Sequence, residues 1–267
     1  MNAGDGRRPA AHGDWNPALY LKFEGERTRA VRDLLAQTPL SNPGFVYDLG
    51  CGPGNSTELL RRRFPSAELI GVDTSEAMLA HARERVPDAR FLRDSVDGFR
   101  PDHAPDLIFA NSVLQFTPDH QELFANLTSF LPQGGCLAVQ MPDTAREAAH
   151  ALMRMIAVDG PWRERLMPVV KSRAVIADAQ DYYDWLRPHC ARLELWRTTY
   201  VHPLDGAQGV VDWFAGSALR PFLNPLTEKE RESFLASYRR EIIKEYAPRD
   251  DGVILLPYPR LFIVAVR

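Results

Sequence analysis

The chain has 267 residues, of which 45% are hydrophobic and 25% charged, and its formal net charge is -3. This near-neutral balance, with no run of lysines and arginines, argues against nucleic acid as a partner. No apolar stretch approaches the length of a membrane span, and the histidines lack metal-ligand spacing. Cys51, Cys136 and Cys190 form no CxxC pair, which favours small buried thiols in a reducing cytoplasm.

The N-terminal residues 1–14 are rich in Gly, Ala and Arg and lack the apolar stretch of a signal peptide. We expect them to form a disordered leader. A helix is predicted next, because Asn16 can cap it and Pro17 suits its first position. Apolar residues then follow at helical spacing as far as Leu35.

The following hundred residues alternate short apolar strands with helices. Helices are expected at 56–64, 75–85 and 120–131, and strands at 45–49, 68–73, 89–92, 105–110 and 135–141. Strands and helices that alternate at this interval predict a mostly parallel sheet with helices on both faces. Residues 15–142 are therefore expected to form the core half of one α/β domain.

Beyond Pro142 the pattern changes. Two more strands are expected at 193–201 and 258–266, which brings the sheet to seven, and a capping box, Thr227-x-x-Glu230, opens the last helix. The other helices of this part are expected at 144–158, around 182–185 and at 206–219. The pattern predicts that residues 143–267 complete the same domain, with a helical cap inserted between the last two strands of the sheet.

The loop Asp48-Leu-Gly-Cys-Gly-Pro-Gly-Asn55 follows the first strand and opens a helix. Gly50, Gly52 and Gly54 allow backbone angles that are closed to other residues, and they let a ligand approach the backbone. A dinucleotide site would have GxGxxG, but Asn55 stands where its third glycine is expected. Asp48 would repel a pyrophosphate and attract an ammonium or sulfonium. This charge pattern favours S-adenosylmethionine as the cofactor.

Polar residues follow the next strands of the predicted sheet. Asp73 ends the second strand, where a carboxylate can accept hydrogen bonds from the ribose hydroxyls of an adenosine. Asp94 and Ser95 can bind the adenine edge, and Met78 can pack on the adenine face, although a methionine at helical spacing is also typical of a core. Asn111 follows the fourth strand and can hold the methionine end of the cofactor.

These motifs resemble those of the class I methyltransferases, which have a Rossmann-like α/β fold. Gln115, which follows the fourth strand, can orient an acceptor or simply begin a helix. Other segments are similar to the trans-aconitate 2-methyltransferases, and the resemblance covers roughly residues 14 to 267. These segments are Asp14-Trp-Asn-Pro-Ala-Leu-Tyr-Leu21, Ala138-Val-Gln-Met-Pro-Asp143, Trp196-Arg-Thr-Thr-Tyr200 and Pro259-Arg-Leu-Phe-Ile-Val264. The resemblance implies methyl transfer from S-adenosylmethionine to a carboxylate of trans-aconitate.

Such a carboxylate is ionised at pH 7, with an ordinary pKa of about 4, and needs no general base. The remaining carboxylates of the acid call for Arg, Tyr and His side chains. If the last strand runs antiparallel, Tyr258 and Arg260 lie near the pocket, and the preceding strand brings Tyr200 and His202 there. The further candidates for binding the acid are Arg220 in the helical insertion, Gln115, and Trp15 and Tyr20 near the N-terminus.

Alternatives stay open at this point. For each candidate cation or tyrosine, a surface ion pair or a structural hydrogen bond explains the residue equally well, and His81 and His150 are expected on helix surfaces. The same fold could methylate another small organic acid or a natural-product acceptor, or bind its cofactor without turnover. An NAD-dependent oxidoreductase is a third alternative, which Asp48 and Asn55 disfavour.

Overall fold

The computed structural model of the protein describes residues 23–172 and 175–267. The expected leader, the cap at Asn16 and the candidates Trp15 and Tyr20 lie outside the described residues. Seven strands form one sheet in the order β3-β2-β1-β4-β5-β7-β6. The strands are β1 (Phe45–Leu49), β2 (Glu68–Asp73), β3 (Arg90–Arg93), β4 (Leu107–Asn111), β5 (Cys136–Pro142), β6 (Arg192–Asp205) and β7 (Val253–Val266).

Strands β1 to β5 pair in parallel, and β7 runs antiparallel to both of its neighbours. The carboxyl ends of the parallel strands therefore meet at one edge of the sheet, which is where such sheets bind ligands. The prediction of a seven-stranded, mostly parallel α/β sheet is confirmed.

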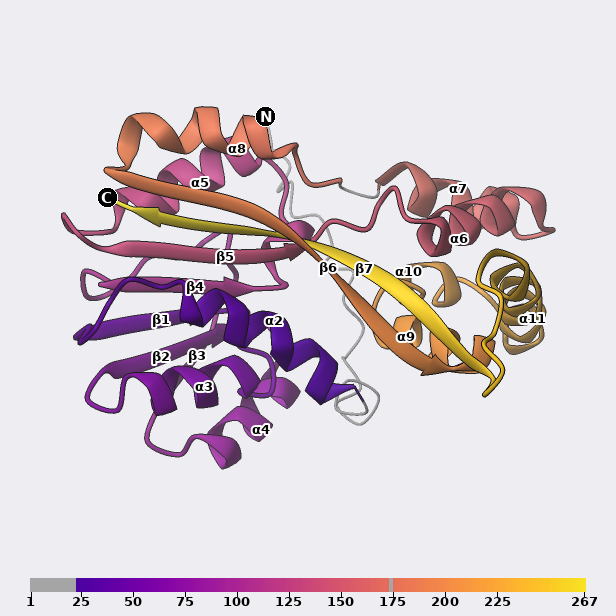
Figure 1. Ribbon diagram of the computed structural model, residues 1–267, viewed down its shortest axis with the longest axis horizontal. Coiled ribbons are helices and arrows are strands. Elements are labelled where there is room, and N and C mark those ends of the chain that lie inside the picture. The colour runs from indigo at the N-terminus through magenta and orange to yellow at the C-terminus, as the bar shows by residue number, and fades with distance from the viewer. Residues whose placement is uncertain (1–22, 173–174) are drawn as a thin grey trace, which may run out of the picture.

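Helices cover both faces of the sheet (Figure 1). Fully buried residues such as Leu34 and Leu60 hold α2 (Glu24–Ala36) and α3 (Asn55–Arg63) on one face, and α4 (Glu76–Arg85) packs beside β3. On the other face, Phe124 belongs to the core beneath α5 (His120–Ser129) and α8 (Ala179–Leu186). Two short 3-10 turns, η1 (Leu114–Phe116) and η2 (Arg187–His189), complete this half.

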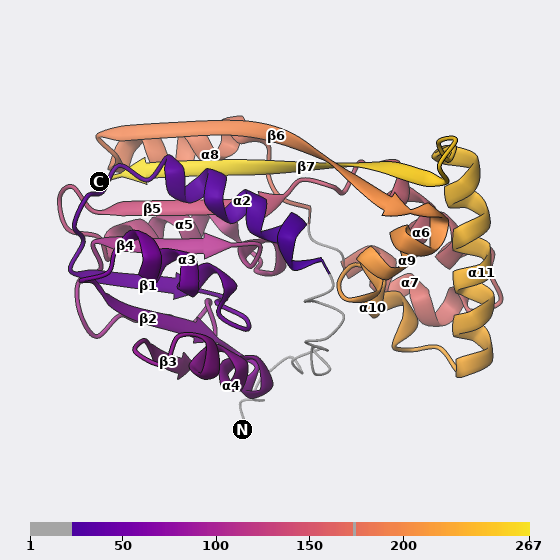
Figure 2. The same ribbon diagram turned by 60° about the horizontal axis from the view of Figure 1, so that its bottom comes forward.

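The other helices form a lobe beyond the edge of the sheet. Strands β6 and β7 are 14 residues long, and the ends that pair only with each other carry this lobe (Figure 1 and Figure 2). A second core, which includes Trp213 and Phe234, joins these helices to the ends of β6 and β7. The helices of the lobe are α6 (Ala148–Asp159), α7 (Arg163–Ser172), α9 (Gly206–Ala215), α10 (Arg220–Leu223) and α11 (Glu228–Glu245).

The lobe differs from the expected cap in its origin. Helices α6 and α7 precede β6, whereas α9 to α11 lie between β6 and β7, so two insertions build one cap. Strand β6 also runs past the expected end at residue 201, because Pro203 lies on an edge strand, where a missing N–H is tolerated. Within the described residues, no helix has the length and apolarity needed to cross a bilayer.

Candidate functional site

The loop between β1 and α3 holds its three glycines in the left-handed region, with φ of 67° at Gly50, 55° at Gly52 and 89° at Gly54. A Cβ on Gly50 would lie 2.4 Å from the side chain of Val113, whereas a Cβ on Gly52 would meet no described atom within 4 Å. Glycine is favoured in both cases. The loop thus bends tightly against Val113 and leaves open space in front of Gly52 for a ligand.

Asp48 is buried at the base of the loop, and the attraction of its charge for the cofactor stays a prediction. The side chain is 1% exposed, and Oδ2 accepts hydrogen bonds from Ser56 Oγ (2.7 Å) and Thr57 Oγ1 (2.6 Å). Burial raises the pKa of the Asp48 carboxyl from 3.8 to about 7. The residue therefore fixes the loop to the first turn of α3 from behind.

This burial predicts a pH dependence of stability. A carboxyl whose folded-state pKa lies above its unfolded value binds its proton more tightly in the folded protein. The free energy of unfolding should therefore fall as pH rises from about 4 to about 7, by on the order of 4 kcal/mol for Asp48. Asp48→Asn should remove this part of the pH dependence. Urea unfolding of both proteins at pH 5, 6, 7 and 8 measures the free energy of unfolding. The same dependence of this free energy on pH in both proteins would contradict the role of Asp48.

Asp73 joins the glycine loop to the end of β2. Its carboxylate accepts hydrogen bonds from the backbone N–H groups of Gly52 (3.0 Å) and Ser75 (2.9 Å). The side chain is half-buried beside the open space at Gly52. The carboxylate lies at the end of β2, as expected. Its contact with the ribose hydroxyls stays a prediction.

The adenine candidates lie around the same strand end. The backbone N–H of Asp94 donates to the carbonyl of Asp73 (3.1 Å), which places the two residues side by side, with the Asp94 side chain exposed. Ser95 Oγ accepts a hydrogen bond from the Gly98 N–H (3.3 Å) and shapes the loop after β3. Met78 is 3% exposed on the first turn of α4. The roles of all three toward adenine remain predictions.

Two hollows meet at Asn111, at the end of β4. A hollow of about 20 Å³ lies against the glycine loop and includes Gly50 and Asn55 in its wall. A cavity of about 310 Å³ lies where the sheet edge meets the helical lobe. Asn111 and Arg27 line both. Asn111 Oδ1 is buried and has no hydrogen-bond partner among the described residues, which suits an atom that awaits a ligand.

Asn55, predicted among the cofactor-binding residues, lies in the wall of the smaller hollow. Its Nδ2 donates to Glu24 Oε1 (2.5 Å), which ties the start of α3 to α2. Its Oδ1 is buried without a hydrogen-bond partner in the part of the chain that the structure describes. The side chain thus both supports the hollow and offers it an acceptor.

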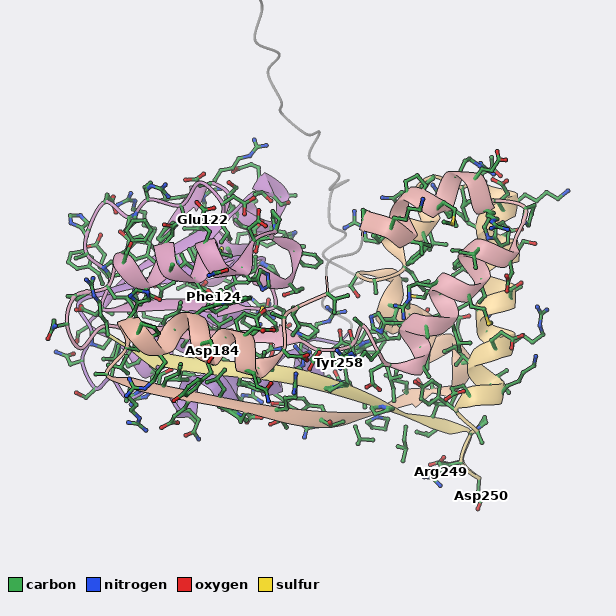
Figure 3. The ribbon with its side chains drawn as sticks, turned by 90° about the horizontal axis from the view of Figure 1, so that it is seen from above. Glu122, Phe124, Asp184, Arg249, Asp250 and Tyr258 are labelled. Atoms are coloured by element: carbon green, nitrogen blue, oxygen red, sulfur yellow. The ribbon has the colours of Figure 1, made fainter. Side chains whose placement is uncertain are left out.

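One wall of the larger cavity alternates guanidinium groups with aromatic rings. Arg260 is 3% exposed, and its Cζ lies 4.9 Å from the centre of the Tyr258 ring. The rings of Tyr258 and Trp213 meet edge to face, with 5.3 Å between centroids, and Cζ of Arg27 lies 5.1 Å from the Trp213 ring. Figure 3 shows Tyr258 between the sheet half and the helical lobe. Such a wall excludes water and presents positive charge.

Gln115 lies in the same cavity wall, on η1. Its Nε2 donates to the carbonyl of Ser112 (2.8 Å), and its Oε1 is buried with no partner among residues 23–172 and 175–267. Asp143 also lines the cavity, but its carboxylate accepts a hydrogen bond from Arg197 Nε (2.7 Å). The described wall therefore combines fixed cations with an amide that can orient an acceptor.

Three candidates for acid binding are not in this wall as far as the structure describes it. Tyr200 is buried against α2 and donates its hydroxyl hydrogen bond to Asp33. His202 is fully buried, and burial lowers its pKa to about 4, so it is neutral at pH 7. Arg220 begins α10, whose following residues Pro221 and Phe222 line the cavity in its place. The expectation for Tyr200 and His202 is corrected, because these two residues of β6 support the wall from behind. Acid binding by Arg220 stays a prediction.

Residues that the sequence did not single out stand in the wall instead. Arg27 comes from α2, and Ser112 adopts a left-handed conformation with φ of 56° at the end of β4. His150 was expected on a helix surface but is 2% exposed, and its Nε2 lies 3.2 Å from Thr144 Oγ1. Ser112 could have been predicted from the sequence, because it directly follows Asn111 at the strand end. Arg27 and His150 could not, because only the packing of α2 and α6 brings them to the cavity.

These residues fit S-adenosylmethionine. The space at Gly52 accepts a ligand against the backbone, Asn111 Oδ1 offers an acceptor to an ammonium group, and Asp73 stands at the ribose position of such sheets. Sets of three or more His, Cys, Asp or Glu side chains arranged to hold a metal are absent from the described residues.

The chain is similar to known methyltransferases in sequence profile and in fold. A methyltransferase-domain family profile matches residues 46–135. The fold is similar to that of the YcgJ protein from Bacillus subtilis, with TM-score 0.59, 14% identity, and coverage of 90% of this chain and 98% of that one. It is also similar to phosphoethanolamine N-methyltransferase 2 of Haemonchus contortus in complex with S-adenosylhomocysteine, with TM-score 0.52, 16% identity, and coverage of 90% and 52%.

Sequence relatives are much closer. The chain is 50% identical over 252 residues to a trans-aconitate 2-methyltransferase of Yersinia pestis (strain Pestoides F), covering 94% of this chain and 98% of the relative. It is 48% identical over 254 residues to one of Rhodopseudomonas palustris (strain HaA2), covering 95% and 99%. The chain therefore belongs to the trans-aconitate 2-methyltransferase family, enzymes of the class I fold that depend on S-adenosylmethionine.

Proposed function

We propose that the protein methylates one carboxylate of trans-aconitate with S-adenosylmethionine, yielding the monomethyl ester and S-adenosylhomocysteine. The observation that carries the proposal is the buried Arg260 guanidinium in the wall of the cavity that begins at Asn111. A buried arginine beside such a cavity is suited to a carboxylate, because its planar donors match the two oxygens. The family relatives are named for the same acid.

The chemistry needs little from the protein beyond positioning. Bound S-adenosylmethionine supplies an electrophilic methyl group on a sulfonium. The attacking carboxylate is already ionised at pH 7, and charge is lost as anion and cation combine, so a dry site favours the reaction. Arg260 and Arg27 hold the acid, and the rings of Trp213 and Tyr258 exclude water. One hydrogen of Gln115 Nε2 is donated to the Ser112 carbonyl, and the second orients the reacting carboxylate by donating to it.

The test is a comparison of acceptors. Methyl transfer is measured for trans-aconitate, cis-aconitate, isocitrate and a panel of phenols, with release of S-adenosylhomocysteine as the common readout. We expect the highest kcat/KM for trans-aconitate, with the ester as product. A clear product from another acceptor, and none from trans-aconitate, would overturn the substrate assignment and leave the methyltransferase standing.

His150 gives a specific reason to weigh a second acceptor class, because an imidazole in the wall can act as a base toward a hydroxyl group. With a carboxylate acceptor no base is needed. His150→Gln should then lower kcat for trans-aconitate less than about tenfold, whereas loss of a base costs on the order of 10²- to 10⁴-fold. His81→Gln, on an exposed helix face, is the control. A larger loss in kcat for His150→Gln would favour an acceptor that must be deprotonated.

We also propose that the enzyme acts in the cytoplasm on a small-molecule acid, without nucleic acid as a partner. The three cysteines, all within the described residues, are free and buried, which suits a reducing compartment. The net charge of -3 provides no field that would attract a polyanion.

A further inference from the structure

A buried polar cluster connects three neighbouring strands behind the acid-binding wall. Arg260 Nη1 donates hydrogen bonds to Ser112 Oγ and to Gln140 Oε1, each at 3.0 Å. Ser112 Oγ donates in turn to Gln140 Oε1 at 2.9 Å. The three residues come from the end of β4, from β5 and from β7, and Gln140 is fully buried. The cluster therefore joins the cavity wall to the interior of the sheet.

The hydrogen-bond pattern fixes the orientation of the guanidinium. Arg260 Nη1 carries two hydrogens, and each has its own oxygen in this cluster. Both of these acceptors are neutral, so these two hydrogen bonds orient the guanidinium without adding a negative charge beside it. A planar group held at two points cannot rotate about its last bonds, and a bidentate contact with a carboxylate depends on that plane.

The cluster is costly for a purely structural feature. Ser112 adopts φ of 56°, a conformation that non-glycine residues rarely adopt. Its backbone holds it there, because Ser112 N–H donates to the Gln140 carbonyl (2.8 Å) and its own carbonyl accepts from Gln115 Nε2 (2.8 Å). Gln140 Nε2 is buried and lacks a hydrogen-bond partner among the described residues. An apolar side chain at position 140 would avoid that desolvation cost.

We infer that Gln140 and Ser112 are positioning residues that set the plane of the Arg260 guanidinium for the carboxylate of the acceptor. The inference rests on the proposed function, since it assigns Arg260 to the acid. Strain and an unsatisfied buried amide occur together where function requires a fixed geometry. Ser112 adds a second connection, because its carbonyl also holds Gln115, so one residue places both the cation and the amide.

The main test substitutes Gln140. Gln140→Met keeps the size of the side chain and removes the acceptor, and it should raise KM for the acid about tenfold without changing Kd for S-adenosylmethionine. Gln140→Glu places a carboxylate beside Arg260 that competes with the acid, and it should raise the same KM by about 100-fold or more. Gln133→Glu, exposed in the loop before β5, is the control for added negative charge and should leave both constants unchanged.

A double-mutant cycle separates positioning from general packing. In the Arg260→Gln background, Gln140→Met should have no further effect on KM for the acid, because the group that it orients is gone. Ser112→Gly and Ser112→Ala both remove the hydroxyl, but only glycine relieves the backbone strain. Both should raise KM for the acid about equally, while Ser112→Gly has the higher Tm.

The outcomes are distinguishable. An unchanged KM for the acid in Gln140→Met, or effects of Gln140→Met and Arg260→Gln that multiply, would overturn the inference while the wild-type enzyme still esterifies the acid. No methyl transfer by the wild-type enzyme to any carboxylic acid would instead overturn the proposed function.

Discussion

Replacing Arg260 by glutamine should lower kcat/KM for trans-aconitate by roughly 100- to 1000-fold, while Kd for S-adenosylmethionine changes less than about threefold. The guanidinium is buried in the acceptor cavity and is held by Ser112 and Gln140. Truncating one partner of a buried, hydrogen-bonded charge pair costs on the order of 2–5 kcal/mol. Most of the change should appear in KM, because the residue binds the acid and not the methyl group.

Arg260→Lys keeps the charge and loses the planar pair of donors, so it should recover only part of the loss. Arg249→Gln is the matched control, since Arg249 lies in the exposed turn at the far end of the helical lobe (Figure 3). Steady-state kinetics with the acid varied, and calorimetric titration of the cofactor, give the two constants. An Arg260→Gln enzyme with unaltered acid kinetics would mean that another cation binds the acceptor.

The second large effect is expected at Gly52. Gly52→Ala should weaken S-adenosylmethionine binding by roughly 10- to 100-fold, because the methyl group would occupy the open space in front of the loop where the cofactor approaches the backbone. The change also introduces a side chain at φ of 55°, which costs on the order of 1–2 kcal/mol of folding stability.

Gly134→Ala separates the two contributions. Gly134 has φ of 82°, and a Cβ there would also meet no described atom within 4 Å, but it lies in the loop before β5, at the opposite end of that strand from the site. Both variants should lose similar stability in thermal unfolding, and only Gly52→Ala should lose cofactor affinity in titration. Equal affinities in the two variants would show that the space at Gly52 is not the cofactor site.

Much of the fold is decided by local pattern. Short apolar runs alternating with helical periodicity require a parallel sheet, because only helices on both faces can bury such strands. The residue at which each strand ends also follows from the local pattern. Because the carboxyl ends of parallel strands share one edge of the sheet, this is enough to place Asp73, Asn111 and the glycine loop there. We expected Tyr258 and Arg260 near the pocket if the last strand ran antiparallel. Strand β7 does run antiparallel to β5, and both residues line the cavity.

Whether a predicted site residue faces the cavity, and which residues pack over it, depended on the tertiary structure. Asp48 has the right position for a ligand, but Ser56 and Thr57 of α3 cover it. Tyr200 lies opposite Tyr258 in the ladder, yet α2 supplies Asp33 and takes its hydroxyl away from the cavity. Periodicity identifies an element and its apolar face, whereas the docking of α2 and α6 depends on contacts between residues far apart in the chain.

The sequence by itself therefore determined the sheet and the position of the glycine loop, because these depend on spacing within one or two elements. The class of chemistry followed from the resemblance of its motifs to those of the methyltransferases. The acceptor site was decided only in three dimensions. Arg27 of α2, His150 of α6 and Arg260 of β7 are distant in sequence, and they share one cavity because the ribbon of β6 and β7 holds the helical lobe against the sheet edge.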